Sequence, residues 1–357
     1  MQLQRPSSRK PQVFAHRGSS SASASSASAS SASASSASAS GAADYPLPWR
    51  LLIVGCGDVG LRLIQRLRAV RGPAQLSILA TARRTAQCEA IRQAGATPLL
   101  ANLDQPGDVA RLAALGQHAV ILAPPGEGGV RDHRSRRLVA AWAAATRSYP
   151  APRPAFVYLS TTGVYGDCSG AWVDECSPAR PQHDRSRRRW DAEEQWRSRL
   201  GAVRLRVPGI YAGDRLPLAR IAQGLPCLDP GEDSYSNHIH AEDLAQLAWL
   251  ALFRAGPGRL YTVADDEPLP MGQWFEAVAA AFGMPAVPRL PRAQAQLRVS
   301  PMMWSFMTES RRLRNSRMHR ELRPRLIAPR ARDYLLSIHG AQLHSIHPQA
   351  PGLQSSR

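Results

Sequence analysis

Residues 51–60 read Leu51-Leu52-Ile53-Val54-Gly55-Cys56-Gly57-Asp58-Val59-Gly60, and the helix-like segment 61–70 follows directly. An apolar run of strand length followed by the spacing Gly-x-Gly-x-x-Gly predicts a buried strand, a tight turn and a helix. In such a unit Gly55 permits the turn, Gly57 lets the backbone approach a pyrophosphate and Gly60 lets the helix pack against the strand. The stretch therefore predicts a dinucleotide site, with the pyrophosphate on the free amides of the helix N-terminus.

Strand-like apolar runs alternate with helix-like segments beyond this stretch. The runs are Leu51–Val54, Leu76–Ala82, Thr97–Leu100, Ala119–Ala123 and Phe156–Ser160. This alternation predicts an α/β fold of the Rossmann type, a doubly wound parallel sheet with right-handed crossovers and helices on both faces. Ligands of such sheets bind at the carboxyl ends of the strands.

The second run ends in Arg83 and Arg84. Folds that prefer NAD place an acid near this point to accept from the ribose 2′-hydroxyl, whereas arginine suits a 2′-phosphate. We therefore expect NADP(H), with NAD as the second possibility; the alternative is that both arginines are merely exposed at a helix start. Order along the chain adds further expected cofactor contacts: Asp58, Val59, Leu103, Ala123 and Pro124.

Residues 160–166, Ser-Thr-Thr-Gly-Val-Tyr-Gly, resemble the strand and turn that carry the active-site Ser or Thr of extended short-chain dehydrogenases, the NAD-dependent epimerase/dehydratase family. Residues 204–211 are similar to the next strand with its cofactor-facing turn, and residues 237–245 to the loop and helix start after the substrate segment. The resemblance covers roughly residues 49–336. It implies that Thr161 lies at the catalytic centre and that Thr161 and Pro208 contact the cofactor.

The family usually carries a tyrosine and a lysine four residues apart on the helix after this strand, and the lysine lowers the tyrosine pKa. Segment 184–194 contains neither residue. Aligning it on either of two acids fills the tyrosine and lysine positions with other residues: Arg185 and Arg189 with Glu193 as the anchor, or Ser186 and Trp190 with Glu194. Lys10 is the only lysine in the chain, so no alignment supplies one. The chain is thus similar to an atypical branch without the catalytic pair.

A substitute for that pair has to come from elsewhere in the sequence. Arg189 can replace the charge and the ribose contact of the lysine, but its very high pKa prevents proton exchange. Tyr165 and Thr161 are the nearest candidates for acid/base work at the strand end. The alternatives are packing for Tyr165 and a hydrogen bond to the nicotinamide region for Thr161.

Composition divides the chain into four parts. Residues 1–45 are Ser/Ala-rich without hydrophobic periodicity, which predicts disorder. Their basic, acid-free start is also similar to an organellar transit peptide. We expect the cofactor domain over residues 46–212, a smaller C-terminal substrate lobe over 213–340 in which residues 237–265 return to the cofactor domain, and a flexible tail over 341–357.

The formal net charge of +18 is compatible with nucleic-acid binding, but 44 of the 45 basic residues are arginine, a skew that coding-sequence composition explains as well. We expect no specific nucleic acid, no membrane span and a monomer or homodimer. The five scattered cysteines suit a reducing cytoplasm. His238 and His240 lack further ligands at metal spacing, so no metal is expected.

Function follows from these expectations in two forms. The first is an NAD(P)-dependent oxidoreductase or epimerase-like enzyme with a small-molecule substrate. Arg215, Arg220 and residues 310–317 make that substrate anionic or similar to a nucleotide sugar, unless these arginines form only a solvated basic surface. The second is a non-catalytic NADP(H)-binding sensor or scaffold, since fold alone does not decide activity.

Overall fold

The structure is a computed structural model that describes residues 49–72, 74–147 and 155–346, with side chains described through residue 338. The described residues form one compact unit. The expectations for residues 1–45 and 347–357 lie outside the described residues.

A central sheet of seven strands organises this unit. Its strands are β1 (Trp49–Val54), β2 (Leu76–Ala82), β3 (Thr97–Leu100), β4 (His118–Ile121), β5 (Phe156–Thr161), β7 (Val203–Val207) and β12 (Leu260–Thr262). They are ordered β12-β7-β5-β4-β1-β2-β3, and every pairing is parallel. The predicted α/β fold with a Rossmann-type parallel sheet is confirmed, and its five predicted strands form at nearly the predicted bounds.

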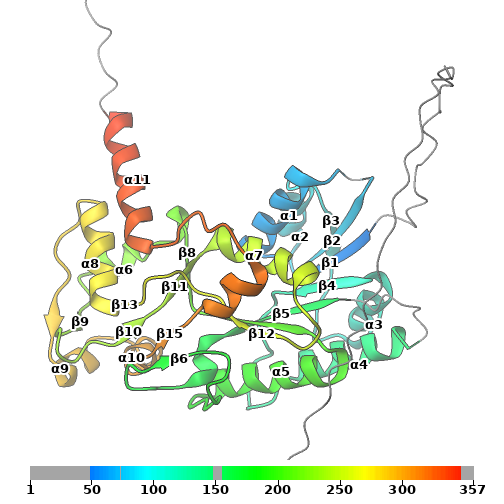
Figure 1. Cartoon of the computed structure of the whole chain (residues 1–357), viewed down its shortest axis with the longest axis horizontal. Coiled ribbons are helices and arrows are strands. Elements are labelled where there is room, and N and C mark those ends of the chain that lie inside the picture. The colour runs from blue at the N-terminus through cyan, green and yellow to red at the C-terminus, as the bar shows by residue number, and fades with distance from the viewer. Residues whose placement is uncertain (1–48, 73, 148–154, 347–357) are drawn as a thin grey trace, which may run out of the picture. The chain divides into compact units, whose positions relative to one another are not determined.

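Helices cover both faces of the sheet (Figure 1). They are α1 (Asp58–Val70), α2 (Thr85–Gln93) and α7 (Ala241–Arg254) on one face, and α3 (Pro106–Leu115), α4 (His133–Ala145) and α5 (Asp184–Leu200) on the other. Strand β1 explains why two cores form. Leu51 and Ile53 pack on the first face and Leu52 and Val54 on the second, because successive side chains of a strand point to opposite sides. All four are buried, so the strand is apolar throughout.

The order of the strands reverses between β1 and β4. From β1 the chain proceeds outward through β2 and β3, and from β4 it proceeds in the other direction through β5 and β7. The amides of Leu122 and Ala123, just after β4, both donate to the carbonyl oxygen of Val54 at 2.9 Å, which closes the two strand ends together. Such a reversal is the place where doubly wound sheets bind ligands.

Short elements between and after the last strands of the sheet form a smaller lobe. They comprise β6 (Trp172–Val173), β8 (Gly209–Tyr211), β9 (Cys227–Leu228), β10 (Tyr235–Ser236), β11 (His238–His240), β13 (Leu269–Pro270), β14 (Arg289–Leu290), β15 (Arg312–Leu313), α6 (Leu218–Ala222), α8 (Met271–Ala281), α9 (Arg292–Gln296), α10 (Pro301–Met307) and α11 (Ala331–Ile346), with helical turns at Thr162–Tyr165, Gly213–Arg215 and Met318–Leu322. The strands pair two by two, as β8 with β11 and β10 with β13. Helix α11 continues into the segment expected as a flexible tail.

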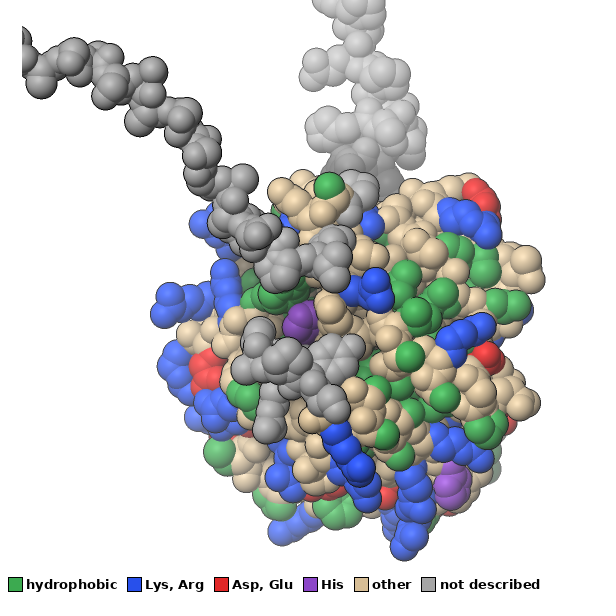
Figure 2. All heavy atoms as spheres, turned by 90° about the vertical axis from the view of Figure 1, so that its right-hand side faces the viewer, with side chains coloured by type: hydrophobic (Ala, Val, Ile, Leu, Met, Phe, Trp, Pro, Cys, Tyr) green, Lys and Arg blue, Asp and Glu red, His purple; other side chains and the backbone are tan. Residues whose placement is uncertain are grey.

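Basic side chains are scattered over the face shown in Figure 2, where they lie among apolar and other side chains. Within the described part of the chain, no helix combines the length and apolar character needed to cross a membrane.

Helix α5 is fixed on the sheet by a buried ion pair and a buried aromatic ring. Glu193 is fully buried and accepts from Arg206 of β7 at 2.9 and 3.1 Å. Three residues further along, Trp196 stacks on Tyr158 and donates its indole proton to the Ser135 hydroxyl at 2.9 Å. Because both anchors are on the inner face, they set the rotation of the helix about its axis.

Replacing the buried carboxylate is therefore expected to destabilise the fold. Glu193→Ala leaves the Arg206 guanidinium buried without its partner, and we expect the free energy of unfolding to fall by about 3–5 kcal/mol. Urea unfolding followed by tryptophan fluorescence measures this loss. Glu89→Ala, which removes an exposed acid paired with Arg92, is the matched control and should cost less than about 1 kcal/mol. Equal losses in the two variants would contradict the anchoring role.

Candidate functional site

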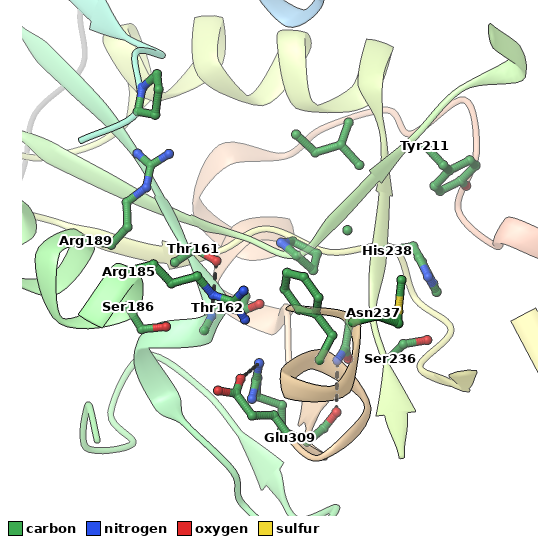
Figure 3. A pocket seen from close by; sticks show the side chains of 18 of the residues that line it. Thr161, Thr162, Arg185, Ser186, Arg189, Tyr211, Ser236, Asn237, His238 and Glu309 are labelled. Atoms are coloured by element: carbon green, nitrogen blue, oxygen red, sulfur yellow. Dashed lines mark hydrogen bonds and ion pairs between the residues drawn. The ribbon is translucent and has the colours of Figure 1, made fainter. Parts of the chain in front are cut away.

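A cavity of about 820 Å³ lies at the carboxyl ends of the sheet strands. One part of its wall follows β2, β4, β5 and β7, and contains Arg83, residues 124–127, residues 161–163 and Pro208. Another part comes from the lobe, with residues 235–238 and side chains of α8 and α10. The N-terminal half of α5 supplies a third part (Figure 3).

The three glycines of the turn after β1 have different surroundings: Gly55 and Gly60 are closely packed, and Gly57 is open. Gly55 has φ +86°, and a Cβ there would lie 2.6 Å from the backbone of Ala123, so only glycine fits. A Cβ on Gly60 would lie 2.9 Å from the sulfur of Cys56, because α1 packs closely on the strand. A Cβ on Gly57 would meet nothing within 4 Å. The turn thus leaves open space beside the backbone of Gly57, at the N-terminus of α1.

The two residues after Gly57 are oriented differently. Val59 is buried in the core. Asp58 forms ion pairs with Arg62 at 3.0 Å and with Arg215 at 2.8 Å, so its negative charge is balanced. An anion at the start of α1 therefore meets free amides and a helix dipole without an uncompensated carboxylate beside it.

The arginines after β2 separate in the structure. Arg83 is exposed and lines the cavity, whereas Arg84 is the N-cap residue of α2 and is absent from the cavity wall. Nearby, Arg134 donates two hydrogen bonds to Asp104 and, with a smaller contribution from Arg83, lowers the pKa of that carboxyl. The guanidinium of Arg83 therefore lies at the end of β2, where the ribose 2′-substituent of a dinucleotide is expected to bind.

The remaining expected cofactor contacts divide between wall and core. Pro124 and Pro208 line the cavity. Leu103 and Ala123 are buried in the core beneath it, and Ala123 holds the backbone against Gly55.

Thr161 is at the carboxyl end of β5 and lines the cavity. Its hydroxyl oxygen accepts the amide proton of Gly163 at 3.2 Å, which leaves the hydroxyl proton available to a ligand. Thr162 and Gly163 continue the same wall.

Tyr165 lies outside this wall. It is buried, and its hydroxyl contacts the carbonyl oxygen of Asp174 at 2.8 Å and the hydroxyl of Thr262 at 2.9 Å. Burial raises the pKa of Tyr165. The geometry favours the packing role that the sequence left open for this residue over acid/base work.

Helix α5 contributes four residues to the cavity wall: Arg185, Ser186, Arg188 and Arg189. Trp190 is exposed and Glu193 is buried, so the placement favours the alignment anchored on Glu193, with Arg185 and Arg189 at the tyrosine and lysine positions. Arg189 donates to the carbonyl oxygen of Leu159 at 2.9 Å and to the Tyr158 hydroxyl at 3.2 Å. Figure 3 shows Arg185 and Arg189 near Thr161.

The lobe wall contains residues that sequence reasoning did not assign to the site. His238 is buried against Trp274, with ring centroids 4.3 Å apart, and burial lowers its pKa to about 3, so the imidazole is neutral. Phe306 of α10 and Glu309 also line the cavity. These residues come from segments far apart in the chain. His238 lies in the motif at residues 237–245, but no local motif marks Phe306 or Glu309. Among the residues that the structure describes, no cluster of three potential metal ligands is found.

Sequence comparison gives one partial relative. No protein-family model matches the chain. A 3-diazoavenalumate denitrifying reductase from Streptomyces sp. is 30% identical over 125 residues, which is 35% of this chain and 41% of that protein. The match thus spans less than half of the reductase.

Structural comparison extends over most of the chain. A conserved protein of unknown function from Silicibacter pomeroyi is 33% identical, with a TM-score of 0.68 over 82% of this chain and 99% of the other. A candidate NAD-dependent epimerase/dehydratase from Methylobacillus flagellatus is 27% identical, with a TM-score of 0.59 over 84% and 99%. A short-chain dehydrogenase/reductase superfamily protein from Agrobacterium tumefaciens, solved with bound NAD, shares the fold at 16% identity, with a TM-score of 0.62 over 83% and 98%. These neighbours confirm the resemblance that the ordered motifs at residues 51–60, 160–166, 204–211 and 237–245 predicted: the chain has the fold of the extended short-chain dehydrogenase/reductases, and its structural neighbours include NAD-dependent epimerase/dehydratase proteins.

Proposed function

We propose that this protein binds NADP(H) and acts as an oxidoreductase on a small molecule held in the cavity. The observation that carries the proposal is the open turn at Gly57, at the β1/β4 reversal, with the cavity wall running from Arg83 past Thr161. The NAD-bound relative and the reductase-named relative support the same class of reaction.

The residues of the turn fit a dinucleotide. The free amides at the start of α1 suit the pyrophosphate, and the missing side chain at Gly57 leaves room for it. Arg83 suits a 2′-phosphate as a forked donor. When bound, the nicotinamide supplies or takes up the hydride, and the protein supplies position and charge.

Two side chains would act on the substrate end of the cofactor. Thr161 retains a free hydroxyl proton and can donate it to a substrate oxygen at the end of β5. Arg189 is held by the carbonyl oxygen of Leu159 and keeps a permanent positive charge beside the strand. That charge can hold ribose hydroxyls, as the family's lysine does, but it cannot exchange a proton at neutral pH.

A second function has its own supporting observation. Arginines stand at both positions of the usual catalytic pair, and the hydroxyl of Tyr165 is sequestered by Asp174 and Thr262. A protein arranged in this way can bind NADP(H) without turnover and serve as a sensor or scaffold. Nucleotide binding is common to both functions, and turnover separates them.

Nucleotide preference is the first test. Titration of the purified full chain, followed by nucleotide fluorescence, should give tighter binding of NADPH than of NADH. Arg83→Gln should weaken NADPH about tenfold or more and leave NADH nearly unchanged, because a charge-assisted contact to the phosphate is lost. Arg84→Gln, one residue further and outside the cavity wall, is the control and should change little. Equal affinity of the wild type for both nucleotides would contradict the NADP(H) preference.

The glycine turn gives a second test. Gly57→Ala places a methyl group in the space proposed for the pyrophosphate, so both nucleotides should bind at least about tenfold more weakly. Its unfolding free energy should change by no more than about 1 kcal/mol, since the added Cβ meets no atom of the protein. Gly107→Ala, at another open glycine in α3, should leave binding intact. Unchanged affinity in Gly57→Ala would refute the placement of the pyrophosphate.

Turnover distinguishes the two functions. NADPH oxidation is followed by absorbance with a panel of aldehydes, ketones and 3-diazoavenalumate, the compound named for the partial relative. An active substrate should be turned over about a hundredfold more slowly by Thr161→Val, which keeps the side-chain shape and removes the donor. Thr146→Val, at the end of α4, is the control. Tight NADPH binding without turnover on any member of the panel would favour the sensor.

A further inference from the structure

Arg185 is the residue at the tyrosine position, and its side chain is held toward the lobe. Its guanidinium donates to the Ser305 hydroxyl at 3.0 Å and lies over the ring of Phe306, with its central carbon 4.0 Å from the ring centroid. Both partners belong to α10, so Arg185 connects α5 to the lobe across the cavity. Figure 3 shows the side chain extending into the space between Thr161 and the lobe wall.

The charge of Arg185 is not balanced by an acid. Of the other arginines in the cavity wall, Arg134, Arg215 and Arg311 have carboxylate partners, namely Asp104, Asp58 and Glu309. Among the described residues, Arg83, Arg188 and Arg189 have no carboxylate partner either, but the contacts of Arg188 and Arg189 are to carbonyl or hydroxyl oxygens on the sheet side rather than to the lobe. Among the described residues, none has a carboxylate within ion-pair distance of Arg185; its contacts are a neutral hydroxyl and an aromatic face. Burial, and then the neighbouring Arg311, lower the pKa of Arg185 against the opposing effect of Glu309, as expected for a cation that lacks its own anion.

The lobe side of the cavity wall combines apolar and aromatic side chains with the charged pair Glu309 and Arg311. Phe306 and Met303 come from α10, and Trp274 and Phe275 from α8. His238 adds a neutral ring stacked on Trp274. A flat apolar body fits these surfaces through stacking, and a guanidinium offers two parallel donors to a carboxylate.

We propose that the substrate side of the cavity takes a planar aromatic or conjugated molecule with one carboxylate, which Arg185 binds. This inference deepens the proposed function and rests on the same cavity. It makes Arg185 a binding residue at the position where the family keeps a proton donor. The guanidinium fixes one end of the substrate, and the body of the substrate then extends along the aromatic wall toward Thr161.

The same features argue against a nucleotide sugar. A diphosphate needs several unpaired cations on the lobe side, whereas Arg215 and Arg311 are already paired with acids there.

The test uses the full-length protein and 2-naphthoate, a planar and fluorescent carboxylate that is ionised at neutral pH. Binding is measured by calorimetry, with and without saturating NADPH, against the neutral isostere 2-naphthamide and against UDP-glucose. We expect 2-naphthoate to bind about tenfold or more tightly than 2-naphthamide, because a charge-assisted bidentate contact is lost in the amide. UDP-glucose should bind more weakly than 2-naphthoate.

Variants assign the effect to Arg185. Arg185→Gln should weaken 2-naphthoate about tenfold or more and leave 2-naphthamide unchanged, and Arg185→Lys, which keeps the charge without the fork, should fall between. Arg187→Gln is the matched control, since Arg187 is on the same helix, exposed and paired with Asp184 outside the cavity wall. Its affinity for 2-naphthoate should equal that of the wild type. The comparison of 2-naphthoate with 2-naphthamide uses only the wild-type protein, so it does not depend on whether a variant folds.

Three results would overturn the inference: equal affinity for acid and amide, an unchanged affinity in Arg185→Gln, or tighter binding of UDP-glucose than of 2-naphthoate. The affinity for NADPH is measured separately for the wild type and each variant. Loss of nucleotide binding alone refutes the proposed cofactor function, while carboxylate binding that depends on Arg185 still supports this inference. Binding of NADPH without any binding of 2-naphthoate refutes this inference but not the proposed cofactor function.

Discussion

The ion pair between Glu193 and Arg206 is the interaction on which the arrangement of the site depends. It is buried between α5 and β7, and one of its partners cannot be removed without leaving a charge in the core. A helix packed only by alanine and leucine could rotate or slide by a fraction of a turn at small cost. A bidentate carboxylate–guanidinium contact fixes one orientation, and one turn and two turns before Glu193 that orientation directs Arg189 and Arg185 into the cavity.

This orientation changes what the site can do. In the family, the same helix face carries a tyrosine whose proton can be exchanged and a lysine that tunes it. Here both positions carry guanidinium groups, which stay charged at every physiological pH and donate without releasing a proton. The helix therefore loses proton exchange and gains the capacity to hold anions. In the proposed function, holding and orienting the substrate would therefore contribute more than acid/base chemistry.

Much of the fold follows from local sequence. The apolar run at residues 51–54 is buried on both faces, and the glycine spacing that follows it fits only a turn in which Gly55 takes a positive φ against Ala123. These are constraints between residues close in the chain or in adjacent parallel strands, so a pattern reveals them. Arg83 and Arg84 illustrate the limit of such patterns: they are adjacent and identical, yet the start of α2 after β2 directs one to the cavity and leaves the other outside it.

By itself, the sequence determined the parallel α/β sheet, the glycine turn between β1 and α1 and the absence of a lysine for the usual catalytic pair, because these depend on residue type and short-range spacing. Tertiary structure decided that Tyr165 is sequestered by Asp174 and Thr262 rather than exposed to a substrate. It also decided that Arg185 meets Phe306, a residue more than a hundred positions further along the chain. Contacts of that kind arise when the lobe folds back over the carboxyl edge of the sheet, and no local periodicity encodes which side chains then face each other.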